Sequence, residues 1–247
     1  MLKRITILVC ISFLCFSLSG SFKKEQLKYS NVKTAYKEKW ALVKGKLQKA
    51  GIDTSQFEVF IRVFKKEAEL EVWARSKSAS QFKLVETYAI CRSSGELGPK
   101  RQQGDMQVPE GFYTVSIYQP NSAYYLALGI SYPNKSDRIK GNQADPGGDI
   151  MIHGNCVTIG CMPLTDDKIK EVYLMAIEAH NNGQQNVPVH IFPTRLNNEG
   201  MAWLKANEKD ATKLAFWNNI KDGFTYFETK KTIPTVSIDA KGDYTFQ

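Results

Sequence analysis

The stretch from residue 150 to residue 164 gathers side chains that can do chemistry. It reads IMIHGNCVTIGCMPL and contains His153, Cys156 and Cys161. The 247-residue chain has only three histidines and five cysteines, so this is an unusual concentration of both. Imidazole and thiol groups placed together can bind a metal, form a disulfide, or act as a nucleophile with its base.

A zinc site would need three or four nitrogen or sulfur ligands, usually in recognisable pairs. The segment contains no CxxC or HExxH pair, and His180 and His190 fall on separate predicted elements. We therefore predict no metal. A disulfide from Cys156 to Cys161 or to Cys91 is sterically possible, and a buried thiol packed as a small hydrophobe is a further alternative.

If one of these cysteines is a nucleophile, the local sequence favours Cys161 over Cys156. Cys161 follows a glycine and precedes a predicted helix, whereas Cys156 has neither neighbour. Gly160 allows a sharp turn that brings its N–H close to a ligand, as stabilisation of a tetrahedral oxyanion requires. His153, at the end of a predicted strand, would be held rigidly enough to take the thiol proton.

The surrounding periodicity predicts the elements that must hold this segment. Apolar residues at helical spacing, stopped by Gly51, predict a helix over 27–50. Thr165 is the expected cap of a helix over 165–181, and a further helix is predicted over 201–219. Strands are predicted over 57–63, 70–74, 83–91, 112–118, 123–130, 149–153 and 187–192, with strand and turn in the tail. This order predicts an α+β fold.

Taken together, these motifs resemble a known family. The run HGNCVTIGC, over 153–161, is similar to the signature of the L,D-transpeptidase catalytic domain (YkuD-like), and in particular to its YafK-like branch. Similar segments are YAICRSSGELGPKRQQGDMQVPEGFY, YPNKSDR, VHIFP and the pair FW at 216–217. The resemblance runs from about residue 34 to the C-terminus. Ile159 is a departure, because many members have a second histidine there.

The resemblance implies a fold and a set of site residues. The fold would be an L,D-transpeptidase-like β-sandwich core of mixed sheets with flanking helices. Cys161 would be the nucleophile, His153 the general base, and the N–H groups of Gly160 and Cys161 the oxyanion hole. The expected substrate-binding residues are Gly154, Asn155, Thr158, Tyr132 and Arg138.

Two of these residues have ordinary structural alternatives. Arg138 could bind a carboxylate of a peptide as a bidentate fork, or could stabilise its loop by pairing with Asp137 or Asp145. Tyr132 could line the cleft or simply pack.

The implied reaction is acyl transfer on peptidoglycan stem peptides. Cys161 would attack a diaminopimelate–D-alanine-type bond and form a thioester, which an amine resolves in transpeptidation and water resolves in an L,D-carboxypeptidase or amidase. No cofactor is implied, and a wall-attached protein is a further possible partner. The alternative from another class is an inert wall-binding module, against which the intact His153 and Cys161 pair argues.

The first twenty residues, MLKRITILVCISFLCFSLSG, predict an export signal. A basic start precedes a short apolar run and small residues, with cleavage expected near Ser19. A retained N-terminal anchor is the alternative, although the run is short for a membrane span. The prediction gives a signal over 1–19, a helical segment over 20–50 and a catalytic domain over 51–247, located in the periplasm or cell envelope.

The charge composition is compatible with a cell-wall substrate but does not by itself indicate one. The net charge of +8 suits an anionic wall polymer, but the lysines are scattered. No basic run interleaved with aromatic residues is present, so we predict no nucleic-acid partner. The sequence makes no prediction of oligomeric state.

Overall fold

The computed structural model describes residues 21–247, so the predicted export signal lies outside the described residues. In chain order the elements are α1 (Phe22–Gln26), α2 (Ser30–Lys49), β1 (Phe57–Phe64), β2 (Glu69–Ser76), β3 (Lys83–Ala89), β4 (Gly111–Ser122), β5 (Tyr125–Ile130), α3 (Lys135–Lys140), β6 (Met151–His153), β7 (Met162–Pro163), α4 (Asp166–Asn181), β8 (Pro188–Phe192), α5 (Asn198–Asn207), α6 (Ala211–Lys230), β9 (Val236–Ile238) and β10 (Tyr244–Phe246). The predicted strands are all present within this list.

Eight strands form a mixed sheet in the order β3-β2-β1-β8-β4-β5-β6-β7. The pairs β1–β8 and β6–β7 are parallel, and the other neighbours are antiparallel. The long strand β4 pairs with β8 at its start and with β5 along the rest, so it joins two halves of one curled sheet. This confirms the predicted α+β fold with mixed strands and flanking helices.

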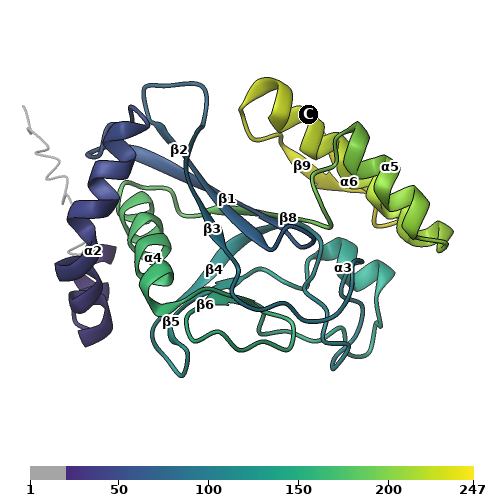
Figure 1. Cartoon of the computed structure of the whole chain (residues 1–247), viewed down its shortest axis with the longest axis horizontal. Coiled ribbons are helices and arrows are strands. Elements are labelled where there is room, and N and C mark those ends of the chain that lie inside the picture. The colour runs from purple at the N-terminus through teal and green to yellow at the C-terminus, as the bar shows by residue number, and fades with distance from the viewer. Residues whose placement is uncertain (1–20) are drawn as a thin grey trace, which may run out of the picture.

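Strand β1 shows why helices cover both faces of the sheet. Its side chains alternate between two apolar layers, because successive residues of a strand point to opposite faces. Val59, Ile61 and Val63 pack into the core that contains α2 and α4. Phe60 and Phe64 pack against α6 on the other face. Figure 1 shows α2 and α4 side by side at one end of the molecule and α5 and α6 at the opposite end.

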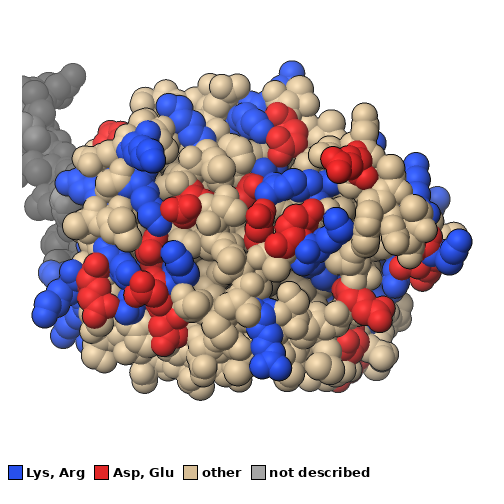
Figure 2. Space-filling view, in the orientation of Figure 1, with Lys and Arg blue, Asp and Glu red and all other residues tan. Residues whose placement is uncertain are grey.

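The predicted helical segment over 20–50 packs directly on the rest of the chain. Val32, Val43 and Leu47 of α2 are fully buried in the same core as α4. Ion pairs such as Lys46 with Glu171 add to this contact. On the described part of the face in Figure 2, basic and acidic side chains are interspersed. No helix within residues 21–247 is long and apolar enough to cross a bilayer.

The helix predicted over 201–219 is wrong in its bounds. The chain forms α5 and then α6, because Asp210 accepts hydrogen bonds from the N–H groups of Thr212 and Lys213 and starts a new helix. The short helix α3 lies in a stretch predicted as loop. Asn134 and Asp137 begin it by exchanging side-chain and backbone hydrogen bonds.

Asp137 should make the stability of the protein depend on pH. Its side chain is 1% exposed and accepts a hydrogen bond from the Tyr113 hydroxyl. Burial raises the pKa of Asp137 from 3.8 to about 6. The folded state therefore binds this proton at a higher pH than the unfolded chain does, and the resulting stabilisation is lost as pH rises from about 4 through about 6.

Between pH 4 and pH 7 we expect the free energy of unfolding of the wild type to fall by roughly 2–4 kcal/mol relative to that of Asp137→Asn. Urea unfolding of both proteins at the two pH values measures this difference, in which the effects of the other titrating groups cancel. Parallel stability curves for the two proteins would contradict the assignment.

Candidate active site

His153 and Cys161 belong to adjacent segments of the chain at the edge of the sheet. His153 ends β6, and Cys161 directly precedes β7, which pairs with β6 in parallel. Both side chains line a cavity of about 290 Å³, together with Arg92, Tyr124, Val157, Thr158 and Ile159. The fold therefore brings together the two residues that the sequence analysis paired.

The hydrogen bonding of His153 fixes its tautomer. Its Nδ1 lies 2.5 Å from the carbonyl oxygen of Gly154. A carbonyl can only accept, so Nδ1 carries the proton and Nε2 keeps a lone pair. The ring of Tyr124 stacks on the imidazole at a centroid distance of 4.5 Å. Burial lowers the pKa of His153, so the imidazole is neutral at pH 7 and can accept a proton at Nε2.

Cys161 carries the free thiol of the described residues, and it is half-buried. Burial raises the pKa of Cys161, while the backbone N–H of Met151 acts in the opposite direction. In the resting structure Sγ donates to the carbonyl oxygen of Asp149, at 3.5 Å. The pair is therefore a neutral thiol and a neutral imidazole, and the thiol must rotate before its proton can pass to Nε2.

The loop between the two residues is held by its own polar groups. The Thr158 hydroxyl donates to the carbonyl oxygen of Cys161 at 2.8 Å and accepts the N–H of Gly160 at 3.1 Å. Gly160 has a φ of +139°, and a Cβ there would lie 3.0 Å from the carbonyl oxygen of Gln107. Only glycine suits this backbone. The Gly160 N–H is thus engaged with Thr158 at rest rather than directed at a reacting oxygen.

Gly154 and Asn155 connect the loop to the start of α4. A Cβ on Gly154 would lie 2.5 Å from the carboxylate of Asp166 and 2.8 Å from the carbonyl oxygen of Tyr124. Asn155 has a φ of +55° and donates its backbone N–H to Asp166. Thr165 occupies the cap position of α4, but its side chain makes no capping hydrogen bond. Asp166 instead uses its carboxylate to position the loop.

A disulfide joins Cys91 to Cys156, with a Cα–Cα distance of 5.6 Å. This pairing resolves the alternatives that the sequence left open. Cys156 is consumed by the bridge, so it is neither a metal ligand nor a partner for Cys161. Within residues 21–247 no group of three or more His, Cys, Asp or Glu side chains could hold a metal ion.

Tyr132 and Arg138 line a different cavity, of about 310 Å³, which also includes Asp149. His153 and Cys161 do not line it. The Tyr132 side chain is buried, and its hydroxyl donates to the carbonyl oxygen of Pro146. Among the described residues Arg138 forms no ion pair with Asp137 or Asp145, and Arg101 pairs with Asp137 instead. The two cavities are neighbours, because Asp149 also accepts the hydrogen bond of the thiol.

The sequence analysis missed two residues of the site. Tyr124 reaches His153 from the turn between β4 and β5, and no motif marks it. Arg92 lines the same cavity as Cys161 and is attached through its neighbour Cys91 to the loop. If the bridge from Cys91 to Cys156 had been predicted, it would have placed Arg92, the residue after Cys91, beside the loop that contains Cys161.

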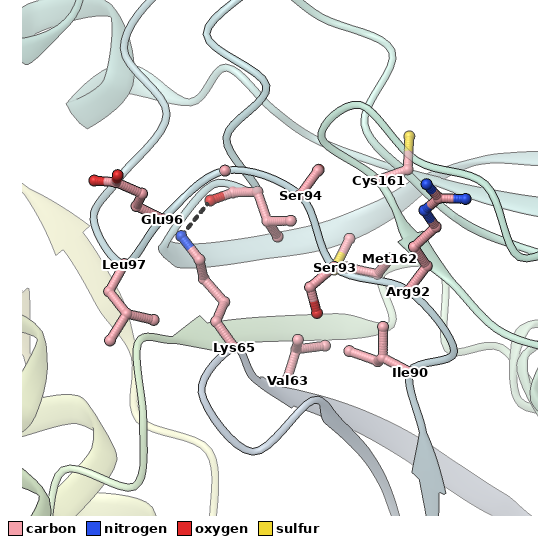
Figure 3. A pocket seen from close by; sticks show the side chains of 12 residues that line it. Val63, Lys65, Ile90, Arg92, Ser93, Ser94, Glu96, Leu97, Cys161 and Met162 are labelled. Carbon is pink, nitrogen blue, oxygen red and sulfur yellow. Dashed lines mark hydrogen bonds between the residues drawn. The ribbon is translucent and has the colours of Figure 1, made fainter.

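A second cavity, of about 200 Å³, is also lined by Cys161. Figure 3 shows Cys161 and Arg92 at one end of it, with Lys65, Glu96 and Leu97 toward the other. Its apolar lining includes Val63, Ile90, Leu97, Val108 and Met162. Cys161 thus lines two hollows, although in Figure 3 its sulfur points away from the other residues that line this second one.

The fold and this site agree with the result of a family comparison. Residues 58–191 match the model of the L,D-transpeptidase catalytic domain, YkuD. The chain belongs to the L,D-transpeptidase catalytic domain family, as the motif predicted.

Individual relatives point the same way. A protein of Escherichia coli K12 named "Putative L,D-transpeptidase YafK" is 42% identical over 183 residues, which cover 73% of this chain and 70% of that protein. Its counterpart in Escherichia coli O157:H7 gives the same values.

Solved structures are similar at lower identity. The helical cell shape determining protein Pgp2 of Campylobacter jejuni has a TM-score of 0.44 at 16% identity, covering 80% of each chain. Bd1075 of Bdellovibrio bacteriovorus has a TM-score of 0.39 at 20% identity, covering 74% of each chain.

Proposed function

We propose that this protein is an exported cysteine acyltransferase that acts on peptidoglycan stem peptides. The observation that carries the proposal is the pairing of His153, with its acceptor Nε2, and the free thiol of Cys161 in one cavity of an L,D-transpeptidase domain. Export is supported by the signal-like residues 1–19 and by the disulfide, which is typical of oxidising compartments.

The chemistry follows from the protonation states of the pair. His153 Nε2 takes the thiol proton, and the sulfur of Cys161 attacks the carbonyl carbon of a diaminopimelate–D-alanine-type bond. The tetrahedral intermediate collapses when the imidazolium returns its proton to the leaving amine, which departs and leaves a thioester. Neutral His153 then deprotonates an incoming amine or water, which attacks the thioester and restores the thiol.

The backbone N–H groups of Cys161 and Gly160 would stabilise the oxyanion. Because the Gly160 N–H is bonded to Thr158 at rest, the loop must release it as the intermediate forms. Arg138 and Tyr132, in the neighbouring cavity, would hold a part of the stem peptide farther from the scissile bond, with Arg138 directed at its carboxylate. Gly154, Asn155 and Thr158 would contribute mainly by shaping the loop.

Replacing Cys161 with alanine should abolish turnover of purified tetrapeptide muropeptides, by about 10³-fold or more, because no thioester can form. Mass spectrometry of the products measures this loss. With the wild type it also separates new cross-links from shortened stems, and so transpeptidation from hydrolysis. Thr165→Ala is a suitable control, because this exposed side chain makes no capping hydrogen bond.

Two results would overturn the proposal. An active Cys161→Ala protein would show that the nucleophile is elsewhere. A wild type that binds wall material but changes none of the stem peptides would indicate the inert binding module.

A further inference from the structure

Arg92 occupies a distinctive place beside the thiol. Two cavities reach Cys161, and Arg92 and Cys161 are the two residues that line both of them. In Figure 3 the guanidinium of Arg92 lies at the same end of the apolar cavity of about 200 Å³ as the Cys161 side chain. A substrate bond held at the sulfur would therefore have this cation next to it.

The backbone of Arg92 is fixed relative to the catalytic loop. Its neighbour Cys91 is covalently bound to Cys156 within that loop. Cys91 also donates its N–H to the carbonyl oxygen of Pro163, at 3.0 Å, two residues after Cys161. The backbone of Arg92 is therefore held beside the loop that contains Cys161, and its exposed side chain is free to meet a ligand there.

Arg92 also has unused hydrogen-bonding capacity. Within residues 21–247 its guanidinium forms no hydrogen bond and no ion pair. The other cation of the apolar cavity, Lys65, is engaged by Glu110 and by the carbonyl oxygens of Gly98 and Val108. An arginine fork with free donors matches a carboxylate in both charge and geometry.

We propose that Arg92 binds the terminal carboxylate of the residue that leaves when the thioester forms. This assignment rests on the proposed function and deepens it. In a stem peptide that ends in a D-amino acid, only the scissile nitrogen and one carbon separate the scissile carbonyl from that carboxylate. The side-chain carboxylate of diaminopimelate lies a whole aliphatic chain away, so it is too distant for a cation placed at the sulfur. Arg92 thereby restricts the enzyme to bonds at the free end of a stem.

Two tetrapeptide stems that differ only at the C-terminus, carboxylate or carboxamide, test this assignment. We expect wild-type kcat/KM to favour the carboxylate by about 10–100-fold, as charge-assisted hydrogen bonds do. Arg92→Gln should lower the carboxylate value toward the carboxamide value and leave the carboxamide value unchanged. The carboxylate preference of Arg92→Lys should lie between those of the wild type and Arg92→Gln. The control Arg75→Gln removes an arginine of β2 that pairs with Glu58 of β1, and it should behave as wild type.

A third stem, amidated at the diaminopimelate side chain, identifies which carboxylate is bound. The proposal requires the rate with this stem, relative to the unmodified carboxylate stem, to be the same in wild type and Arg92→Gln. It is overturned if Arg92→Gln slows all stems equally, or if the effect follows the side-chain carboxylate.

Alkylation of Cys161 separates a failure of this inference from a failure of the proposed function. Iodoacetate carries a carboxylate next to its reacting carbon, and iodoacetamide is its neutral analogue. The rate with iodoacetate divided by the rate with iodoacetamide should fall by about fivefold in Arg92→Gln, as expected for loss of one nearby positive charge. An unchanged ratio would overturn the assignment of Arg92 whatever the true substrate is, and labelling of Cys161→Ala gives the background.

Discussion

The variant His153→Ala is expected to release the terminal D-amino acid from stem peptides about 10²–10⁴-fold more slowly than the wild type. The Cys161 thiol has a raised pKa, so without a base it is protonated at neutral pH. The lowered pKa of His153 keeps the imidazole neutral at pH 7 and leaves Nε2 free to accept the proton. Initial rates of amino-acid release between pH 6 and pH 10 measure the effect.

The pH profile adds a signature that a folding defect would not produce. Above the pKa of His153 the wild-type rate should change little with pH until the thiol itself ionises. The rate of His153→Ala should climb steeply toward high pH, because only solvent can then remove the proton. His180→Gln provides a control histidine on α4, away from the thiol. If His153→Ala kept more than about a tenth of the activity, the role as general base would be wrong.

Glu110→Ala is expected to lower the free energy of unfolding by about 3–5 kcal/mol. Glu110 is fully buried and accepts hydrogen bonds from the N–H of Gly98 and from Nε1 of Trp217, both at 2.7 Å. It also pairs with the buried ammonium of Lys65 at 3.0 Å. Removal of the carboxylate leaves the buried ammonium of Lys65 with only the carbonyl oxygens of Gly98 and Val108 as acceptors and no opposite charge among the described residues in contact with it. Urea unfolding at pH 7 measures the loss.

Burial lowers the pKa of Lys65 even with Glu110 present. In Glu110→Ala the pKa should fall further, so this variant should recover stability relative to the wild type as pH is raised and Lys65 becomes neutral. Glu96→Ala removes an exposed carboxylate from the same loop and should change stability by no more than about 0.5 kcal/mol. A similar small change for Glu110→Ala would show that the buried pair does not anchor the loop.

The strands were predictable from sequence because their apolar residues must be buried. In β1 the run FEVFIRVF indicates a strand covered on both faces, which α4 and α6 provide. The site pair was predictable because His153 and Cys161 are scarce residue types in a short motif, and the parallel pairing of β6 and β7 then joins them.

Other features depend on contacts that the local sequence does not encode. The break between α5 and α6 depends on Asp210 capping a new helix inside a periodic apolar pattern. The choice of Cys91 as the partner of Cys156 depends on where the chain just after β3 meets the loop between β6 and β7. Tyr124 is placed at the site by the turn between β4 and β5, and Arg92 by the disulfide of its neighbour Cys91. Neither residue belongs to the His–Cys motif.

The bond between Cys91 and Cys156 also protects the free thiol of Cys161 from pairing within its own loop. A free Cys156 would share a short loop with Cys161, and an oxidant could close the two into an inactive ring. With Cys156 already bonded to Cys91, which follows β3, that ring cannot form. Oxidised Cys161 can still be capped by a small external thiol, from which it is recoverable. Within residues 21–247, the bridge between two of the three cysteines thus leaves the third sulfur with no free thiol beside it.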